Sequence, residues 1–160
     1  MDKKRLTEIL EKIPLKKIGV LGDFALDAYW HVDMAKAQLS RETPQYNRPI
    51  VKEEYSMGGA SNVAWNLSVL GTGMVKAFSV AGEDWRAGIL SELLRNAGID
   101  TSSMIYSPGW NTVCFAKILL KANNISQEDA RMDFVNTAAV SPEIENTLLE
   151  NLQKSTIYKN

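Results

Sequence analysis

The chain has 160 residues, 45% hydrophobic and 23% charged, which suits one globular domain with a substantial core. Its 18 basic and 19 acidic residues give a formal net charge of −1, without the basic excess of a nucleic-acid-binding protein. The chain has no apolar run of membrane-spanning length and no signal-peptide pattern, so we expect a cytoplasmic protein that binds neither nucleic acid nor membrane.

The N-terminal third predicts a helix, a strand and a region of short strands. Apolar residues at helical spacing run from Leu6 to Ile13, where Pro14 ends the pattern. The apolar run KIGVLG at residues 17–22 predicts a buried strand. Residues 28–57 contain aromatic and β-branched residues, and the prolines within them exclude a helix, so short strands are expected there.

The rest of the chain alternates between helices and strands. The turn GGASN opens a helix with Val63, Leu67 and Leu70 on one face, and residues 75–80 predict a strand. Asp84 and Gly98 are placed to cap the next helix. Residues 103–106, 112–121 and 131–135 predict further strands. The last helix starts at Ser141 and Pro142, and its predicted apolar face is formed by Ile144, Leu148, Leu149 and Leu152.

This alternation predicts an α/β fold with a largely parallel sheet. The aromatic and polar strands of 28–57 and 112–121 fit such a sheet poorly, so they are assigned to a separate small flap. The only cysteine, Cys114, and the only histidine, His31, exclude an internal disulfide and leave too few ligands for a zinc cluster, so no metal site is predicted. Both side chains are expected to serve packing or the surface.

Two segments carry candidate binding residues at the carboxyl edge of the sheet, where α/β proteins bind ligands: LGDFALD and GGASN. Glycines at 58 and 59 expose backbone, Asn62 offers donors and acceptors, and Asp27 offers a carboxylate, a combination that suits a sugar. Spacing alone leaves two alternatives. The glycines, Asp27 and Asn62 could serve only turns and caps, or the helix start could bind phosphate, although no Walker pattern is present.

Three segments add a resemblance to a known family. GVLGDFALDAYW, LSRETP and GGASNVAWNLSVLG, followed by VAGEDWRAG, resemble the N-terminal half of the PfkB (ribokinase-like) carbohydrate kinases, nearest to the heptose-phosphate kinase-like branch. The resemblance implies a sheet with helices on both faces and a small β lid, formed by about 28–57 and 112–121, over the sugar. It also implies that Asp27, Gly58, Gly59 and Asn62 contact the substrate, a sugar or sugar phosphate.

Weaker candidates for substrate contact are Arg41, Glu42, Lys117 and Arg131, each of which could equally be a solvated surface charge. Tryptophans more often pack than stack on a ligand, and Trp30, which is close to Asp27 in the sequence, is the best candidate for an exception. The resemblance also implies that lids pair into a homodimer. The apolar residues expected on that surface are Tyr29, Val32, Ile50, Val51, Val113 and Phe115.

Family members use ATP and Mg²⁺, and the resemblance implies that their base and anion hole come from a C-terminal G-A-G-D motif, which the 160 residues lack. No catalytic residue is therefore predicted in this chain, and no cofactor is predicted to bind it alone. Residues 1–160 are expected to form the N-terminal part of the kinase domain without the ATP-binding half, as a fragment or a truncated gene product. The alternative is a non-catalytic sugar-binding or partner-binding module.

Overall fold

The computed structural model describes residues 2–122 and 125–155. The chain order of its helices and strands is α1 (Lys3–Lys12), β1 (Lys17–Leu21), β2 (Phe24–Asp33), β3 (Ile50–Gly58), α2 (Gly59–Val69), β4 (Met74–Phe78), β5 (Val80–Gly82), α3 (Trp85–Asn96), β6 (Ile105–Ser107), β7 (Cys114–Ala122), β8 (Ile125–Phe134) and α4 (Pro142–Lys154). Short 3-10 helices cover Ile13–Leu15 and Met34–Lys36. The fold is α/β, as predicted.

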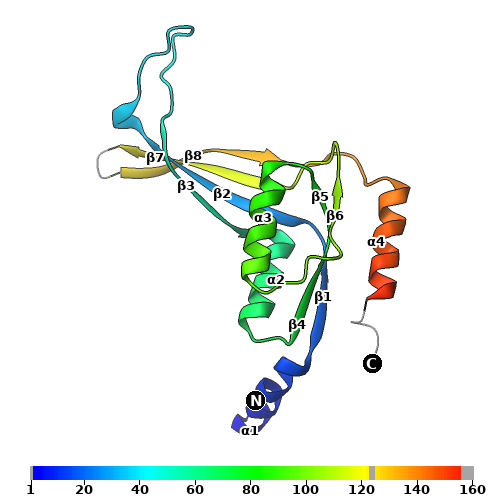
Figure 1. Ribbon diagram of the computed structural model, residues 1–160. Coiled ribbons are helices and arrows are strands. Elements are labelled where there is room, and N and C mark those ends of the chain that lie inside the picture. The colour runs from blue at the N-terminus through cyan, green and yellow to red at the C-terminus, as the bar shows by residue number, and fades with distance from the viewer. Residues whose placement is uncertain (1, 123–124, 156–160) are drawn as a thin grey trace.

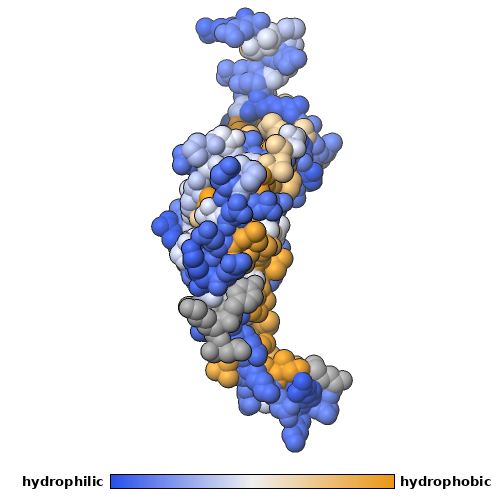
Figure 2. Space-filling model, turned by 90° about the vertical axis from the view of Figure 1, so that its right-hand side faces the viewer, coloured by the Kyte–Doolittle hydropathy of each residue, from blue (hydrophilic) through white to orange (hydrophobic). Residues whose placement is uncertain are grey.

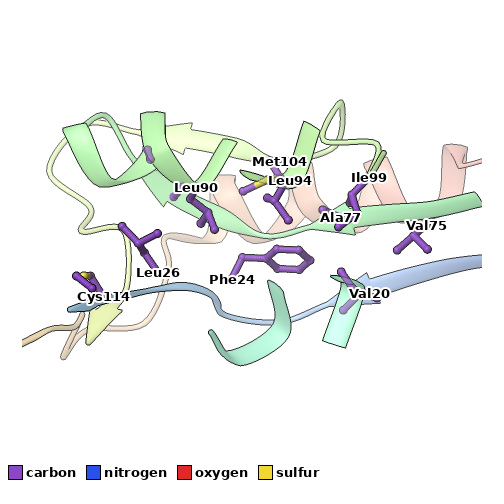
Figure 3. Packing of buried hydrophobic residues seen from close by; sticks show 14 of the residues in the cluster. Val20, Phe24, Leu26, Val75, Ala77, Leu90, Leu94, Ile99, Met104 and Cys114 are labelled. Atoms are coloured by element: carbon purple, nitrogen blue, oxygen red, sulfur yellow. The ribbon is translucent and has the colours of Figure 1, made fainter. Parts of the chain in front are cut away.

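Two short parallel strand pairs form the body of the molecule. β1 pairs with β4, and β5 pairs with β6. Figure 1 shows α2 and α3 on one side of β1 and β4, with α4 on the other side. The buried cluster joins the strands to α3 through large side chains, and Figure 3 shows Phe24 between Leu90 and Leu94 of α3 and Val20 of β1. Burial of these side chains is the main stabilising contribution.

A separate four-stranded sheet extends from this body, in the order β3-β2-β7-β8. β2 runs antiparallel to β3 and parallel to β7, and β7 runs antiparallel to β8. Residues 28–33 thus pair outside the sheet of β1 and β4, as the change in residue pattern predicted. The sequence assignment was incomplete, because residues 131–135 were taken as an isolated strand and most of them belong to β8 in this sheet. That this sheet serves as a lid stays a prediction.

Several sequence assignments need correction. The predicted strand 75–80 is divided at Ser79, whose hydroxyl donates to the Gly22 carbonyl, and β5 then pairs with β6. β1 was predicted to be buried, yet Leu21 is 56% exposed, because among the described strands only β4 pairs with β1. The predicted apolar face of α4 is only partly buried, with Leu149 48% exposed, and Figure 2 shows hydrophobic surface on the side of the molecule where α4 lies.

The packed face of helix α2 only partly matches the one that its large apolar residues predicted. Leu67 packs against the buried cluster as predicted, but Val63 and Leu70 are more than half exposed, whereas Ser61 and Ala64 are fully buried. Small side chains on this face let the helix approach β2 closely, and packing density at a close helix–sheet contact outweighs the size of individual apolar residues. The helical prediction was correct, and the predicted apolar face was correct for Leu67 only.

The two residues with the most reactive side chains have structural surroundings. Cys114 is fully buried, and burial raises the pKa of its thiol to about 11, so it is a poor nucleophile at neutral pH. His31 Nε2 lies 2.6 Å from a carboxylate oxygen of Glu54 on the neighbouring strand. In the described part of the chain, no helix is both long and apolar enough to cross a membrane.

Candidate functional site

Asp27 lies in the middle of the four-stranded sheet. It occupies β2, in register with Ser56 of β3 on one side and Phe115 of β7 on the other. Its carboxylate lies directly over Gly58, since a Cβ added at Gly58 would be 2.7 Å from the Asp27 Oδ1 atom. A side chain at position 58 would therefore displace the Asp27 carboxylate, which explains in steric terms why glycine and this aspartate occur together.

The Gly58–Gly59 turn fixes the start of α2 against the first residues of β2. Gly58 is the N-cap of the helix, and Gly59 adopts a φ of +52°, where an L side chain is strained. A Cβ at Gly59 would also lie 2.8 Å from the Asp23 carbonyl oxygen. The Ser61 hydroxyl lies 2.6 Å from the Ala25 carbonyl oxygen, to which it donates a hydrogen bond. These contacts hold the helix start in one position relative to Asp27.

Asn62 lies in the first turn of α2 rather than at its N-cap, so the capping alternative does not apply to it. Asn62 and Asp27 line the same cleft, a space of about 480 Å³ whose lining residues come from β2, β3, α2 and α3. We call this space the Asp27 cleft. The structure therefore brings Asp27 and Asn62 together beside Gly58, as the sequence predicted. Their contact with a sugar stays a prediction. The cleft is completed by Tyr29, Tyr55, Ser56, Met57, Trp65 and Leu93.

Two of the weaker candidates share a face of the sheet with Asp27. Lys117 of β7 is in register with Tyr29 of β2 and Arg131 of β8, and its ammonium lies 5.2 Å from the centre of the Tyr29 ring. Arg131 donates to both carboxylate oxygens of Asp133, at 2.8 and 2.7 Å. Lys117 forms no hydrogen bond or ion pair with a described residue, so it is the freer cation of the two.

Arg41 and Glu42 are not brought to this site. Both are exposed in the long hairpin between β2 and β3, which projects away from the body of the molecule (Figure 1). Trp30 does not lie on the Asp27 face of the sheet. Side chains alternate along a strand, so two residues three positions apart point to opposite faces, and Trp30 packs against the buried cluster. Its proximity to Asp27 in the sequence was misleading for this reason.

A second cleft lies on the other side of the Gly58–Gly59 turn and was not anticipated from the sequence. It has a volume of about 490 Å³, and we call it the Trp110 cleft. Its lining includes Asp23, Gly59, Trp110, Phe115, Asn136 and Val140. The one sequence signal for this region is the stretch SPGW, whose Pro-Gly pair indicates that Trp110 lies in a loop and not inside a helix or strand.

Asp84 connects the helix α3, the strand β5 and the segment that carries Trp110. Its carboxylate accepts hydrogen bonds from the Ala87 and Thr112 backbone N–H groups, both at 3.0 Å, and from the Arg86 guanidinium at 2.6 Å. Burial disfavours the charged carboxylate, but these three hydrogen bonds outweigh burial and hold the pKa of Asp84 below its usual range. The N-cap predicted from sequence is thus confirmed, and it has a wider structural role.

Comparisons with known proteins agree with this architecture. The sequence matches the family described as "pfkB family carbohydrate kinase" over residues 25–156. It is 30% identical over 155 residues to the bifunctional protein HldE of Trichlorobacter lovleyi, covering 96% of this chain and 30% of that protein. It is 36% identical over 129 residues to HldE of Methylococcus capsulatus, covering 79% of this chain and 25% of the relative.

Solved structures show the same fold. A Clostridium perfringens protein described as a sugar kinase superposes with a TM-score of 0.63 at 18% identity, covering 88% of this chain and 42% of that one. The ribokinase of Cryptococcus neoformans, solved in complex with ADP, gives a TM-score of 0.50 at 17% identity over 74% of this chain and 34% of its own. The chain thus spans less than half the length of these proteins, and on the family match it belongs to the PfkB family of carbohydrate kinases.

Proposed function

We propose that this chain is the sugar-binding part of an ATP-dependent carbohydrate kinase, whose reaction transfers the γ-phosphate of ATP to a sugar hydroxyl. The observation that carries the proposal is the joint position of Asp27 and Asn62 in one cleft beside the Gly58–Gly59 turn, in a chain of the PfkB family. The description of the matching family, carbohydrate kinase, supports a sugar or sugar phosphate as the substrate class.

The geometry suits a ligand with several hydroxyl groups. A carboxylate can accept hydrogen bonds from hydroxyl groups. The Asp27 side chain forms no hydrogen bond or ion pair with a described residue, so its oxygens are available to sugar hydroxyls. The absence of a side chain at Gly58 lets the Asp27 carboxylate lie over the turn, because a Cβ there would displace it. Asn62 can both donate and accept, so the site can orient a hydroxyl for reaction.

The residues of this chain fit the sugar and not the nucleotide. In the described ranges, no group of three or more His, Cys, Asp or Glu side chains is arranged to hold a metal ion. The sequence also contains no glycine-rich phosphate-binding motif. When bound to a complete kinase domain, Mg²⁺ and ATP supply the phosphoryl group and neutralise its charge. The proposal for this chain therefore concerns sugar binding and orientation.

A second candidate function is a sugar-binding or partner-binding module without catalysis. The observation that favours it is the absence of a G-A-G-D motif from the 160 residues. The two functions differ in one measurable respect, which is sugar-dependent consumption of ATP when the chain is combined with a polypeptide that carries the missing motif.

The proposed sugar contact predicts a specific loss of affinity in Asp27→Ala. We expect sugar binding by the purified chain to weaken by about 1–3 kcal/mol, because hydroxyls desolvated in the cleft lose their acceptor. The measurement is isothermal titration with a panel of hexoses, heptoses and their phosphates. Asp33→Ala is the matched control, since Asp33 is a carboxylate on the same strand and the same face. At a strand rise of about 3.3 Å per residue, it lies about 20 Å from Asp27 along the strand. Equal affinity of the two variants would refute the role of Asp27.

The four-stranded sheet is also proposed to mediate a homodimer. Ile50 and Val51, at its far end, are each about half exposed, and Leu39 and Tyr46 of the adjoining hairpin are more exposed still. Val32, which the sequence placed on this surface, is buried instead and cannot contribute. Exposed apolar side chains on this sheet and hairpin make it a candidate interface.

We expect light scattering to give the mass of a dimer, and Val51→Lys to give a monomer, because the charge cannot be solvated in an apolar interface. Val69→Lys, at an exposed apolar position of α2 remote from this sheet, is the control and should leave the dimer intact. A monomeric wild-type chain at high concentration would contradict the proposal.

A further inference from the structure

The Trp110 cleft adjoins Asp27 through two neighbours. Phe115 lines the cleft and is in register with Asp27 on the adjacent strand, and Ala25 lines it two residues before Asp27 on the same face. Side chains in register on neighbouring strands are about 5 Å apart at Cβ, so a ligand that bonds to Asp27 is within one sugar ring of this cleft. The cleft volume of about 490 Å³ suits a monosaccharide.

The segment that carries Trp110 is held from several directions. The Asn136 side chain accepts from the Asn111 backbone N–H at 2.9 Å and donates to the Asn111 carbonyl at 2.8 Å. The next residue, Thr112, is fixed by Asp84 and by the Gly82 backbone N–H, which donates to the Thr112 hydroxyl at 2.9 Å.

The packing at Gly82 is equally tight. A Cβ added at Gly82 would lie 2.2 Å from the Trp110 carbonyl oxygen, so only glycine fits at that position. Trp110 lines the cleft, and its backbone cannot shift easily. Less entropy is lost when a ligand packs on a side chain whose backbone is already fixed.

The polar groups of the cleft indicate the kind of ligand. Asp23 lines the cleft, is exposed, and its carboxylate forms no hydrogen bond or ion pair with a described residue. None of the residues that line the cleft is a lysine or arginine. A carboxylate without a cation disfavours a phosphate group here and favours a neutral ligand with hydroxyl donors. The adjoining aromatic and aliphatic wall provides a surface for the C–H face of a sugar ring.

We propose, on the basis of the proposed sugar-kinase function, that Trp110 and Asp23 are further substrate-contacting residues. The indole of Trp110 packs against the C–H face of the sugar ring, and Asp23 accepts hydrogen bonds from hydroxyls at the edge of that ring. Any phosphate on the substrate points out of this cleft, toward the sheet face that carries Lys117.

The experiment follows the indole N–H signals of the purified chain by NMR during titration with D-mannose, D-fructose and D-mannoheptose. The signal of Trp110 is assigned by its loss in Trp110→Phe. We expect the sugar that binds to shift the Trp110 signal and to leave the signal of Trp85 in place, because Trp85 is exposed on α3 and lines neither cleft. Trp110→Leu and Asp23→Asn should each weaken binding about tenfold, while Trp85→Phe should not.

Melting curves of the variants, recorded in parallel, confirm that they are folded, and the conservative Trp110→Phe should retain most of the affinity. Three results would overturn the proposal. In the first, a sugar binds and Asp27→Ala weakens its binding, but the Trp110 signal does not shift and Trp110→Leu binds as tightly as the wild type. This result would preserve the proposed function. The second is a shift of the Trp110 signal by adenosine and by none of the sugars. The third is no sugar binding by the wild-type chain, which would refute the proposed function as well.

Discussion

Replacing Asp84 by alanine should lower the free energy of unfolding by about 3–5 kcal/mol, because it leaves a buried arginine without its counter-charge. Arg86 is only 8% exposed, and its Nε atom has no hydrogen-bond partner in the part of the chain that the structure describes. Asp84 is the only carboxylate paired with the guanidinium among the described residues, and the Phe134 ring face at 4.2 Å and a long hydrogen bond to Asn111 Oδ1 at 3.4 Å add to it. The variant also loses the acceptor of the Thr112 backbone N–H and the cap of α3.

The measurement is urea unfolding at pH 7. Glu83→Ala is the control, since Glu83 is exposed and should change the stability by less than about 0.5 kcal/mol. The double variant Asp84→Ala, Arg86→Leu should recover part of the loss, because it removes the uncompensated charge as well. An Asp84→Ala variant as stable as the wild type would show that Arg86 finds other partners.

The lowered pKa of Asp84 gives this prediction a pH dependence. A carboxyl group whose pKa is depressed by folding stabilises the native state above its unfolded value of about 3.9, and this stabilisation is lost as pH falls through the folded value. The difference in unfolding free energy between wild type and Asp84→Ala should therefore be full at pH 7 and shrink below about pH 4. A difference that is constant between pH 7 and pH 3 would assign the loss to packing.

The purified 160-residue chain should show no sugar-dependent consumption of ATP. Asp27 and Asn62 can orient a hydroxyl, but no residue of the chain matches the G-A-G-D motif that provides the base and the anion hole in the family resemblance. Loss of a single oxyanion-type donor costs roughly 10²–10³ in rate, so the absence of the whole motif should abolish turnover. The other carboxylates near the strand ends, Asp23 and Glu83, do not belong to a G-A-G-D sequence.

The assay supplies Mg²⁺, ATP and a panel of hexoses, heptoses and their phosphates, and records ADP formation. The control is the same assay without sugar, which measures background hydrolysis. Sugar-dependent turnover that disappears in Asp27→Ala would place the catalytic machinery within these residues and would contradict the prediction. Sugar binding without turnover would agree with both the kinase-part proposal and the non-catalytic module, and adding a polypeptide with the missing motif would then separate them.

The sequence by itself determined the features that depend on neighbouring residues. The cap at Asp84, the first-turn proline at 142 and the Gly58–Gly59 turn all appear where the sequence predicted them, because capping and positive φ are set within a few residues. The grouping of Asp27 with Asn62 was also predicted, since strand ends and helix starts meet at one edge of an α/β sheet.

Only the tertiary structure decided which faces are buried and which segments meet. Trp30 turned away from Asp27 because the pairing of β2 with two neighbours fixes the alternation of its side chains, and α2 buried Ser61 and Ala64 because close packing selected small residues. The Trp110 cleft joins residues from about 23 to 140, held by the contacts of Asp84, Gly82 and Asn136. Contacts over such separations leave no local pattern in the sequence, because they arise from the path of the whole chain.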